Sequence, residues 1–142
     1  MSTSHPLERH RLSLDASLLL GVFLLLHALA HGVGVSGNLD RISQNEPAEL
    51  LGGVWHVSGD TGLAVMAALW AVVGLVTVAA AIEVLRHAPA ARTTVAIAAA
   101  VSLVLNVVFL WAAVVGVVID VLLVLAVWLV PDRIGLRRAS AR

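Results

Sequence analysis

Two histidines one helical turn apart stand inside an apolar stretch near the start of the chain. His27 and His31 are four residues apart, so on a helix both imidazoles project from the same face. Imidazoles at this spacing can bind one metal ion, and Asp120 would add a carboxylate. His27, His31 and Asp120 together predict a metal site suited to zinc, iron or manganese. Haem fits less well, because both rings leave one helix and a second axial ligand would have to come from His56.

Further polar residues are expected around these three ligands. Asn106 follows Ser102 by four residues in another apolar stretch, and it would hydrogen-bond a metal ligand or donate to an oxyanion. His56 and Asp60 precede a third apolar stretch and would lie at the outer entrance of the site. Ionisable and amide side chains inside a bilayer are costly and face the interior of a helix bundle, so they mark candidate functional sites.

The depths of these residues decide whether they can meet. Counting 1.5 Å per residue from the outer ends of the helices puts His31 about 6 Å and His27 about 12 Å below the outer boundary. The same count puts Asn106 and Asp120 about 10 Å deep. The four residues therefore share one layer, in the outer half of the predicted bundle.

Each of these residues also has a structural interpretation. The two histidines can hydrogen-bond Asn106, Asp120 or backbone carbonyls and so link helices. Asn106 and Asp120 can pair with each other and fix the last two helices. Asp60 suits the first turn of a helix, where a carboxylate interacts favourably with the helix dipole.

The composition places the chain among membrane proteins. Of its 142 residues, 60% are hydrophobic and 13% are charged, and the mean hydropathy is +0.98. A soluble domain has about a quarter charged residues, so this chain has too few to cover a surface in water. The absence of cysteine excludes disulfides and thiolate sites. A net charge of zero without a large basic block argues against nucleic-acid binding.

Apolar stretches long enough to cross a bilayer, about 20 residues each, predict an all-α integral membrane protein. The last stretch is long enough for two spans, with a break near Trp111–Gly116. The fold we expect is an antiparallel up-down bundle of four transmembrane helices. The predicted spans cover about 16–35, 61–82, 93–111 and 114–130. Between them we expect an external loop at 36–60, with a short interfacial helix over Pro47–Trp55, a cytoplasmic loop at 83–92 and a cytoplasmic tail at 131–142.

The arginines predict the orientation. Eight of the nine fall before the first span, in loop 83–92 or in tail 131–142, and only Arg41 falls in the external loop. By the positive-inside rule both termini are cytoplasmic. The use of arginine without lysine suggests a bacterial genome rich in G and C, and hence the cytoplasmic (inner) membrane.

The first span has an alternative interpretation as a signal peptide. A basic start, an apolar run and the small residues of Ala28-Leu29-Ala30 resemble a signal-peptidase site. Cleavage there would leave three spans and make His31 the first residue. The apolar stretch continues to Val35, which gives it nearly the full length of a span and favours a retained helix.

Three functions remain open from the sequence. The leading hypothesis is a metal-binding protein whose site opens to the extracytoplasmic side; as an enzyme, it would use the metal to activate water or oxygen toward a lipid-like substrate. The second is a small accessory or scaffold subunit, with a membrane-protein partner or a second copy, whose polar layer is structural. The third is a proton-coupled transport element, against which the inner halves of the spans carry no ionisable residue.

Overall fold

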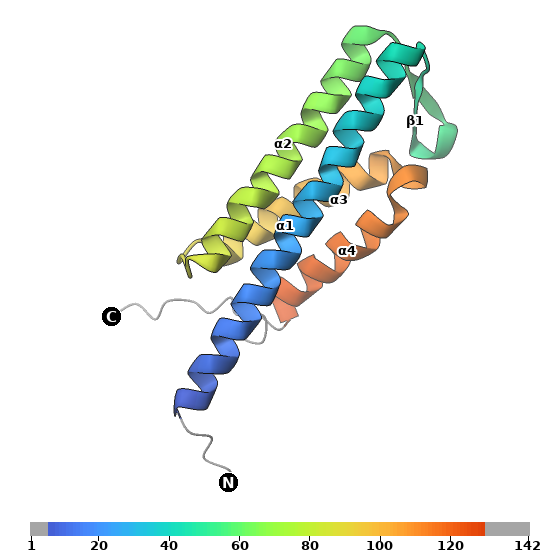
Figure 1. Cartoon of the computed structure of the whole chain (residues 1–142). Coiled ribbons are helices and arrows are strands. Elements are labelled where there is room, and N and C mark those ends of the chain that lie inside the picture. Colours follow the sequence, from blue (N-terminus) through green and yellow to red (C-terminus); the bar gives the residue numbers. More distant parts are fainter. Residues whose placement is uncertain (1–5, 130–142) are drawn as a thin grey trace.

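The computed structural model describes residues 6–129, and the side chains of 16–110 and 113–129. The predicted tail at 131–142 lies outside the described residues. Within this part the chain forms four helices and one short β-hairpin (Figure 1). The helices are α1 (Pro6–Gln44), α2 (Asp60–Leu85), α3 (Ala91–Val108) and α4 (Leu110–Leu129).

The helices have the apolar character that a membrane requires. Among the described residues three helical segments are long and apolar enough to cross a bilayer, namely Ala16–Gln44, Asp60–Leu85 and Ala91–Val108. The apolar part of α4, Ala113–Leu129, is shorter. Many large apolar side chains lie on the outside of the helices, and Leu29 is 71% exposed. An apolar surface this extensive is unusual in soluble monomers, which indicates membrane association.

α1 is longer than the predicted span 16–35. The segment 36–44, expected as loop, continues the helix, and polar side chains in it donate hydrogen bonds to carbonyls of α1 itself. Ser36 Oγ donates to the Val33 carbonyl oxygen at 3.1 Å, and Asn38 Nδ2 donates to that of Gly34 at 2.7 Å. α1 ends before Asn45, which has a φ of 55° and so takes the left-handed conformation common after a helix.

The predicted interfacial helix over Pro47–Trp55 is wrong, because this segment is part of a β-hairpin. Strands β1 (Ala48–Leu50) and β2 (Trp55–Val57) pair antiparallel around the short 3₁₀ turn η1 (Leu51–Gly53). Gly52 and Gly53 have φ of 70° and 86°, in the left-handed region that glycine adopts without steric cost. Two consecutive residues of this kind reverse the chain instead of continuing a helix.

The hairpin covers one end of the molecule. In Figure 1 it lies beside the end of the α1–α2 pair and above the start of α4, and η1 contacts α4. β1 turns Ala48 and Leu50 inward, where they join an apolar cluster with Trp70, Leu105 and Phe109. The hairpin thus connects the α1–α2 side of the molecule to the turn between α3 and α4.

The helices are not equally close to one another. α1 packs chiefly on α2, α3 packs on α4, and α2 also contacts α3. At the end away from the hairpin they close around a second apolar cluster, rich in alanine, which lets helices approach closely. The chain passes from α3 to α4 at Phe109, with a further non-helical residue at Ala113. The predicted break near Trp111–Gly116 is therefore within a few residues of the observed one.

Candidate functional site

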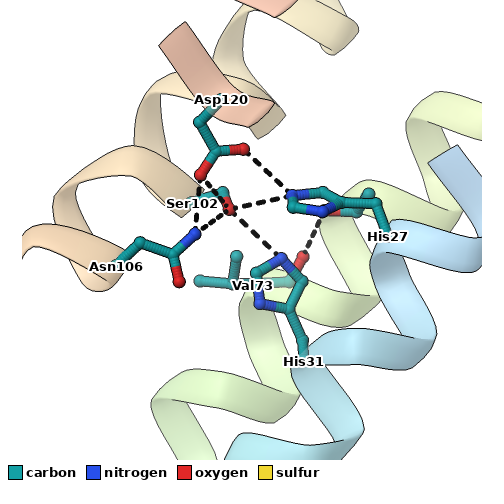
Figure 2. Close-up of polar contacts among 7 residues, drawn as sticks. His27, His31, Val73, Ser102, Asn106 and Asp120 are labelled. Carbon is teal, nitrogen blue, oxygen red and sulfur yellow. Dashed lines mark hydrogen bonds and ion pairs between the residues drawn. The ribbon is translucent and has the colours of Figure 1, made fainter. Parts of the chain in front are cut away.

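A cluster of five polar side chains lies between the two apolar clusters. Figure 2 shows them pointing toward one another from three helices. None is more than 7% exposed. They are His27 and His31 of α1, Ser102 and Asn106 of α3, and Asp120 of α4. The prediction that the two histidines, Asn106 and Asp120 meet in one layer is thus confirmed.

Asp120 accepts three hydrogen bonds. His27 Nε2 donates to Asp120 Oδ1 at 2.9 Å, and Ser102 Oγ and Asn106 Nδ2 each donate to Asp120 Oδ2 at 2.7 Å. Because an ionised carboxylate only accepts, these bonds fix which atoms of the partners carry the hydrogen. The side-chain oxygen of Asn106 must therefore face away from Asp120.

Ser102 stands at the centre of the cluster and belongs to the site, although no role was predicted for it from the sequence. Its Oγ lies 3.2 Å from His31 Nε2, 3.3 Å from His27 Nε2 and 3.2 Å from Asn106 Nδ2. Since its own proton goes to Asp120, Ser102 Oγ accepts from His31 Nε2. The available signal was its spacing of four residues from Asn106, which puts both on one helix face.

The geometry gives no support to the metal site. The three proposed ligands, His27, His31 and Asp120, all surround the Oγ of Ser102, so this hydroxyl occupies the point where a metal ion would have to lie. In the described part of the chain no group of three or more His, Asp or Glu side chains is arranged to hold a metal ion. Metal binding stays a prediction.

Metal analysis of protein purified without a histidine tag tests this point. We expect the wild type to hold no more zinc, iron or manganese than the His27→Ala and His31→Ala variants, because Ser102 Oγ takes the central position. Inductively coupled plasma mass spectrometry would measure the metal content. A stoichiometric metal in the wild type that both variants lose would restore the metal hypothesis.

The cluster is also not a nucleophilic triad. In a Ser-His-Asp triad the histidine uses one ring nitrogen for the serine and the other for the aspartate. Here His27 Nε2 contacts both Asp120 and Ser102, and Ser102 donates directly to the carboxylate. Ser102 and Asp120 are both 0% exposed. Attack on a substrate by Ser102 is not what this geometry supports.

The two residues expected at the entrance do not hydrogen-bond the polar cluster. His56 pairs with Glu49 across the hairpin, and both side chains are on its exposed face. Because side chains alternate along a strand, the inward positions of β1 go to Ala48 and Leu50. Asp60 is exposed in the first turn of α2, as its structural interpretation predicted. The place of both residues at the entrance of the site stays a prediction.

A cavity of about 680 Å³ extends from the polar cluster toward the hairpin. It is bounded mainly by α1 and α4, with side chains from α2, α3 and β1. His27, His31 and Asn106 form its polar floor. The polar residues at its hairpin end are Asn38, Arg41 and Glu49.

Two buried polar atoms in the cavity lining have no hydrogen-bond partner among the described residues. They are Oδ1 of Asn38 and Nε1 of Trp70. The amide orientation of Asn38 is fixed, because its Nδ2 donates to a carbonyl oxygen. A buried polar group without a partner costs about 1–3 kcal/mol, so a hydrogen bond from a ligand to either atom would be favourable.

The polar floor offers further unused hydrogen-bonding atoms. Among the described side chains and backbone nothing hydrogen-bonds Nδ1 of His27, Nδ1 of His31 or Oδ1 of Asn106. The other atoms of these side chains are held by Asp120 and Ser102. The buried network therefore fixes three side chains whose remaining polar atoms are free for a ligand.

Aromatic rings run from the floor toward the turn between α3 and α4. The ring centroids of His27 and His31 are 4.9 Å apart, those of His31 and Trp70 are 5.4 Å apart, and those of Trp70 and Phe109 are 5.2 Å apart. Trp70 comes this close to α1 because residue 34 is glycine, where a Cβ atom would overlap the indole ring.

The arrangement is thus suited to binding. The polar side chains of the cluster hydrogen-bond one another, and their remaining polar atoms lie at the floor of a cavity that is aromatic on one side. Cavities of this size with a few convergent polar groups are typical of sites for small molecules. No family model, curated protein or solved structure matches this chain.

Proposed function

We propose that this protein binds a small, membrane-soluble molecule in the cavity between α1 and α4. The observation that carries the proposal is a cavity of about 680 Å³ lined by residues whose polar atoms lack partners among the described residues. Above all, Trp70 and Asn38 line it, and each has a buried polar atom without a partner, Nε1 and Oδ1 respectively. Its volume lies within the usual range for ligand pockets, about 300–1,000 Å³. The molecule would complete these hydrogen bonds.

The shape of the cavity indicates how the molecule enters. Val33 of α1 and Val115 of α4 line the cavity, yet they are 71% and 73% exposed on the outside of the helices. The cavity therefore opens sideways between two apolar helix surfaces. In a bilayer this opening faces lipid chains, so the ligand is amphipathic: its polar head lies on the floor and its apolar part extends through the opening.

The same proposal includes the membrane topology. An antiparallel bundle of four transmembrane helices with both termini in the cytoplasm agrees with the positions of the arginines. Eight of the nine fall before the apolar part of α1, in 83–92 or in 131–142. The hairpin and the cavity then lie in the extracytoplasmic half of a bacterial cytoplasmic membrane. The ligand is taken from the outer leaflet.

A single large substitution tests the proposal. Ala30 lines the cavity, so Ala30→Trp is expected to fill the opening and abolish binding. The matched control is Leu29→Trp, because the neighbouring Leu29 is 71% exposed and does not line the cavity. Native mass spectrometry and analysis of extracted small molecules would measure what co-purifies with each protein.

We expect a near-stoichiometric bound molecule in the wild type and in Leu29→Trp, and none in Ala30→Trp. Thermal unfolding followed by circular dichroism would show that all three proteins are folded. A folded wild type that carries no small molecule would contradict the proposal. So would an Ala30→Trp variant that keeps the same molecule in the same amount.

A second candidate, a structural role of the polar layer in an accessory subunit, has one observation in its favour. The bonds of Asp120 connect three helices, α1, α3 and α4. In this role the His27→Ala and His31→Ala variants would lose stability or a co-purifying membrane-protein partner. No small molecule would accompany the wild type.

A further inference from the structure

We infer that the head of the bound molecule is a flat ring with oxygen atoms at its edges, that is, a lipid-soluble quinone or its quinol. The inference rests on the proposed function, because it names the ligand class of the same cavity. It depends on three features: the hydrogen-bonding atoms left free, the aromatic surfaces beside them and the lateral opening.

The free atoms require a ligand that both accepts and donates hydrogen bonds. Trp70 Nε1 only donates, so it needs an acceptor such as a carbonyl or hydroxyl oxygen. The free oxygens of Asn38 and Asn106 only accept, so they need a donor such as a hydroxyl group. A quinol carries hydroxyl groups that do both, whereas the head of a fatty acid ionised at neutral pH only accepts.

The histidines suit both oxidation states of such a ring. In the cluster, Nε2 of His27 donates to Asp120 and Nε2 of His31 donates to Ser102. The Nδ1 atom of a neutral imidazole then accepts from a quinol hydroxyl, and that of a protonated imidazole donates to a quinone carbonyl. The floor of the cavity can therefore pair with either form of the ligand.

The walls of the cavity suit a flat ring. Trp70 and Phe109 present aromatic surfaces to it, in series with His31. Gly34 of α1 and Gly116 of α4 also line it, and they let Trp70 and Asn106 pack closely on these helices. Aromatic rings pack favourably on one another in offset or edge-to-face arrangements. The cavity thus combines ring surfaces with space between α1 and α4.

The position of Arg41 and the opening argue against an anionic lipid. Arg41 lines the cavity at its hairpin end, away from the polar floor. A fatty acid with its head at Arg41 would place its apolar chain on the polar floor. A quinone with its head on the floor instead leaves its tail to pass between Val33 and Val115.

The test measures binding of decylubiquinone and palmitate to the full chain in nanodiscs by equilibrium dialysis. We expect the wild type to bind decylubiquinone saturably. Trp70→Phe, which keeps a ring but removes the donor, is expected to weaken binding about tenfold, which corresponds to about 1.4 kcal/mol, near the worth of one hydrogen bond. Trp55→Phe is the matched control, because Trp55 is on the hairpin and does not line the cavity, and it should bind like the wild type.

A second variant separates the two oxidation states and does not depend on the folding of Trp70→Phe. Asn38→Leu removes an acceptor that only a hydroxyl can use, so under anaerobic conditions it should weaken decylubiquinol about fivefold and leave decylubiquinone nearly unchanged. An equal effect on both forms would contradict the hydrogen-bonding scheme, as would unchanged decylubiquinone binding by folded Trp70→Phe.

The outcomes also separate this inference from the proposed function. Binding of palmitate, but not of decylubiquinone, that Ala30→Trp abolishes would overturn the quinone inference and leave the proposed function standing. A wild type that binds neither probe and carries no co-purified small molecule would overturn both. Saturable binding of decylubiquinone that Ala30→Trp and Trp70→Phe weaken supports both.

Discussion

Asp120→Leu is expected to lower the free energy of unfolding by about 3–5 kcal/mol, the usual cost of removing one partner from a buried charged pair. The carboxylate is 0% exposed and accepts from His27, Ser102 and Asn106. Leucine would leave all three donors buried without their acceptor. Reversible unfolding in mixed micelles, followed by circular dichroism, would measure the loss.

The matched control is Asp60→Leu, which makes the same chemical change at an exposed position in the first turn of α2. It removes only a favourable interaction with the helix dipole, so we expect a cost below about 1 kcal/mol. Equal losses in the two variants would show that the network at Asp120 does not stabilise the fold.

A double-mutant cycle with His27 tests the contact itself. If the 2.9 Å bond between His27 Nε2 and Asp120 Oδ1 is strong, His27→Leu combined with Asp120→Leu costs less than the sum of the single variants. Residues in one buried network typically differ from additivity by about 0.5–3 kcal/mol. Strict additivity would mean that the two side chains act independently.

The sequence predicted the polar layer because depth along a helix follows from counting residues. The rise of 1.5 Å per residue is nearly constant, so Asn106 and Asp120 could be matched in depth to His27 and His31 without a structure. Counting gives no side-chain directions. It could not show that Ser102 Oγ lies between the proposed metal ligands, nor that His27 uses one nitrogen for both partners.

The helices could also be predicted where hydropathy alone determines their position along the chain. Segments such as 61–82 are apolar throughout, and the observed α2, Asp60–Leu85, differs by a few residues. The prediction of a loop with an interfacial helix at 36–60 was wrong, because the structure of this region depends on local hydrogen bonds and backbone angles. α1 continues through Asn38, whose side chain bonds to the helix backbone, and Gly52 and Gly53 turn the chain. Mean hydropathy reports neither effect.

The hairpin and the network have different consequences for the cavity. The network holds His27, His31 and Asn106 by bonds that are already complete, so a ligand need not reorganise the floor. The hairpin end instead carries Asn38, whose side-chain oxygen has no partner in the described part of the chain. The site is thus largely preformed at its floor, which reduces the ordering cost of binding.

Gly34→Ala is expected to destabilise the protein by about 1–3 kcal/mol, the usual cost of overpacking a well-packed interior. A Cβ atom at residue 34 would overlap the indole ring of Trp70, which is itself buried between α1 and Phe109. The ring must move, and its Nε1 atom moves with it. The same substitution should therefore also weaken binding of decylubiquinone.

The matched control is Gly32→Ala on the same helix, where a Cβ atom would meet nothing within 4 Å. Alanine favours a helix over glycine by about 0.5–1 kcal/mol, so this variant is expected to stabilise the protein. The two glycine substitutions should thus change the free energy of unfolding in opposite directions. Because the overlap involves the indole, Trp70→Phe should recover part of the loss in Gly34→Ala, and a combined loss equal to the sum would contradict the clash as its cause.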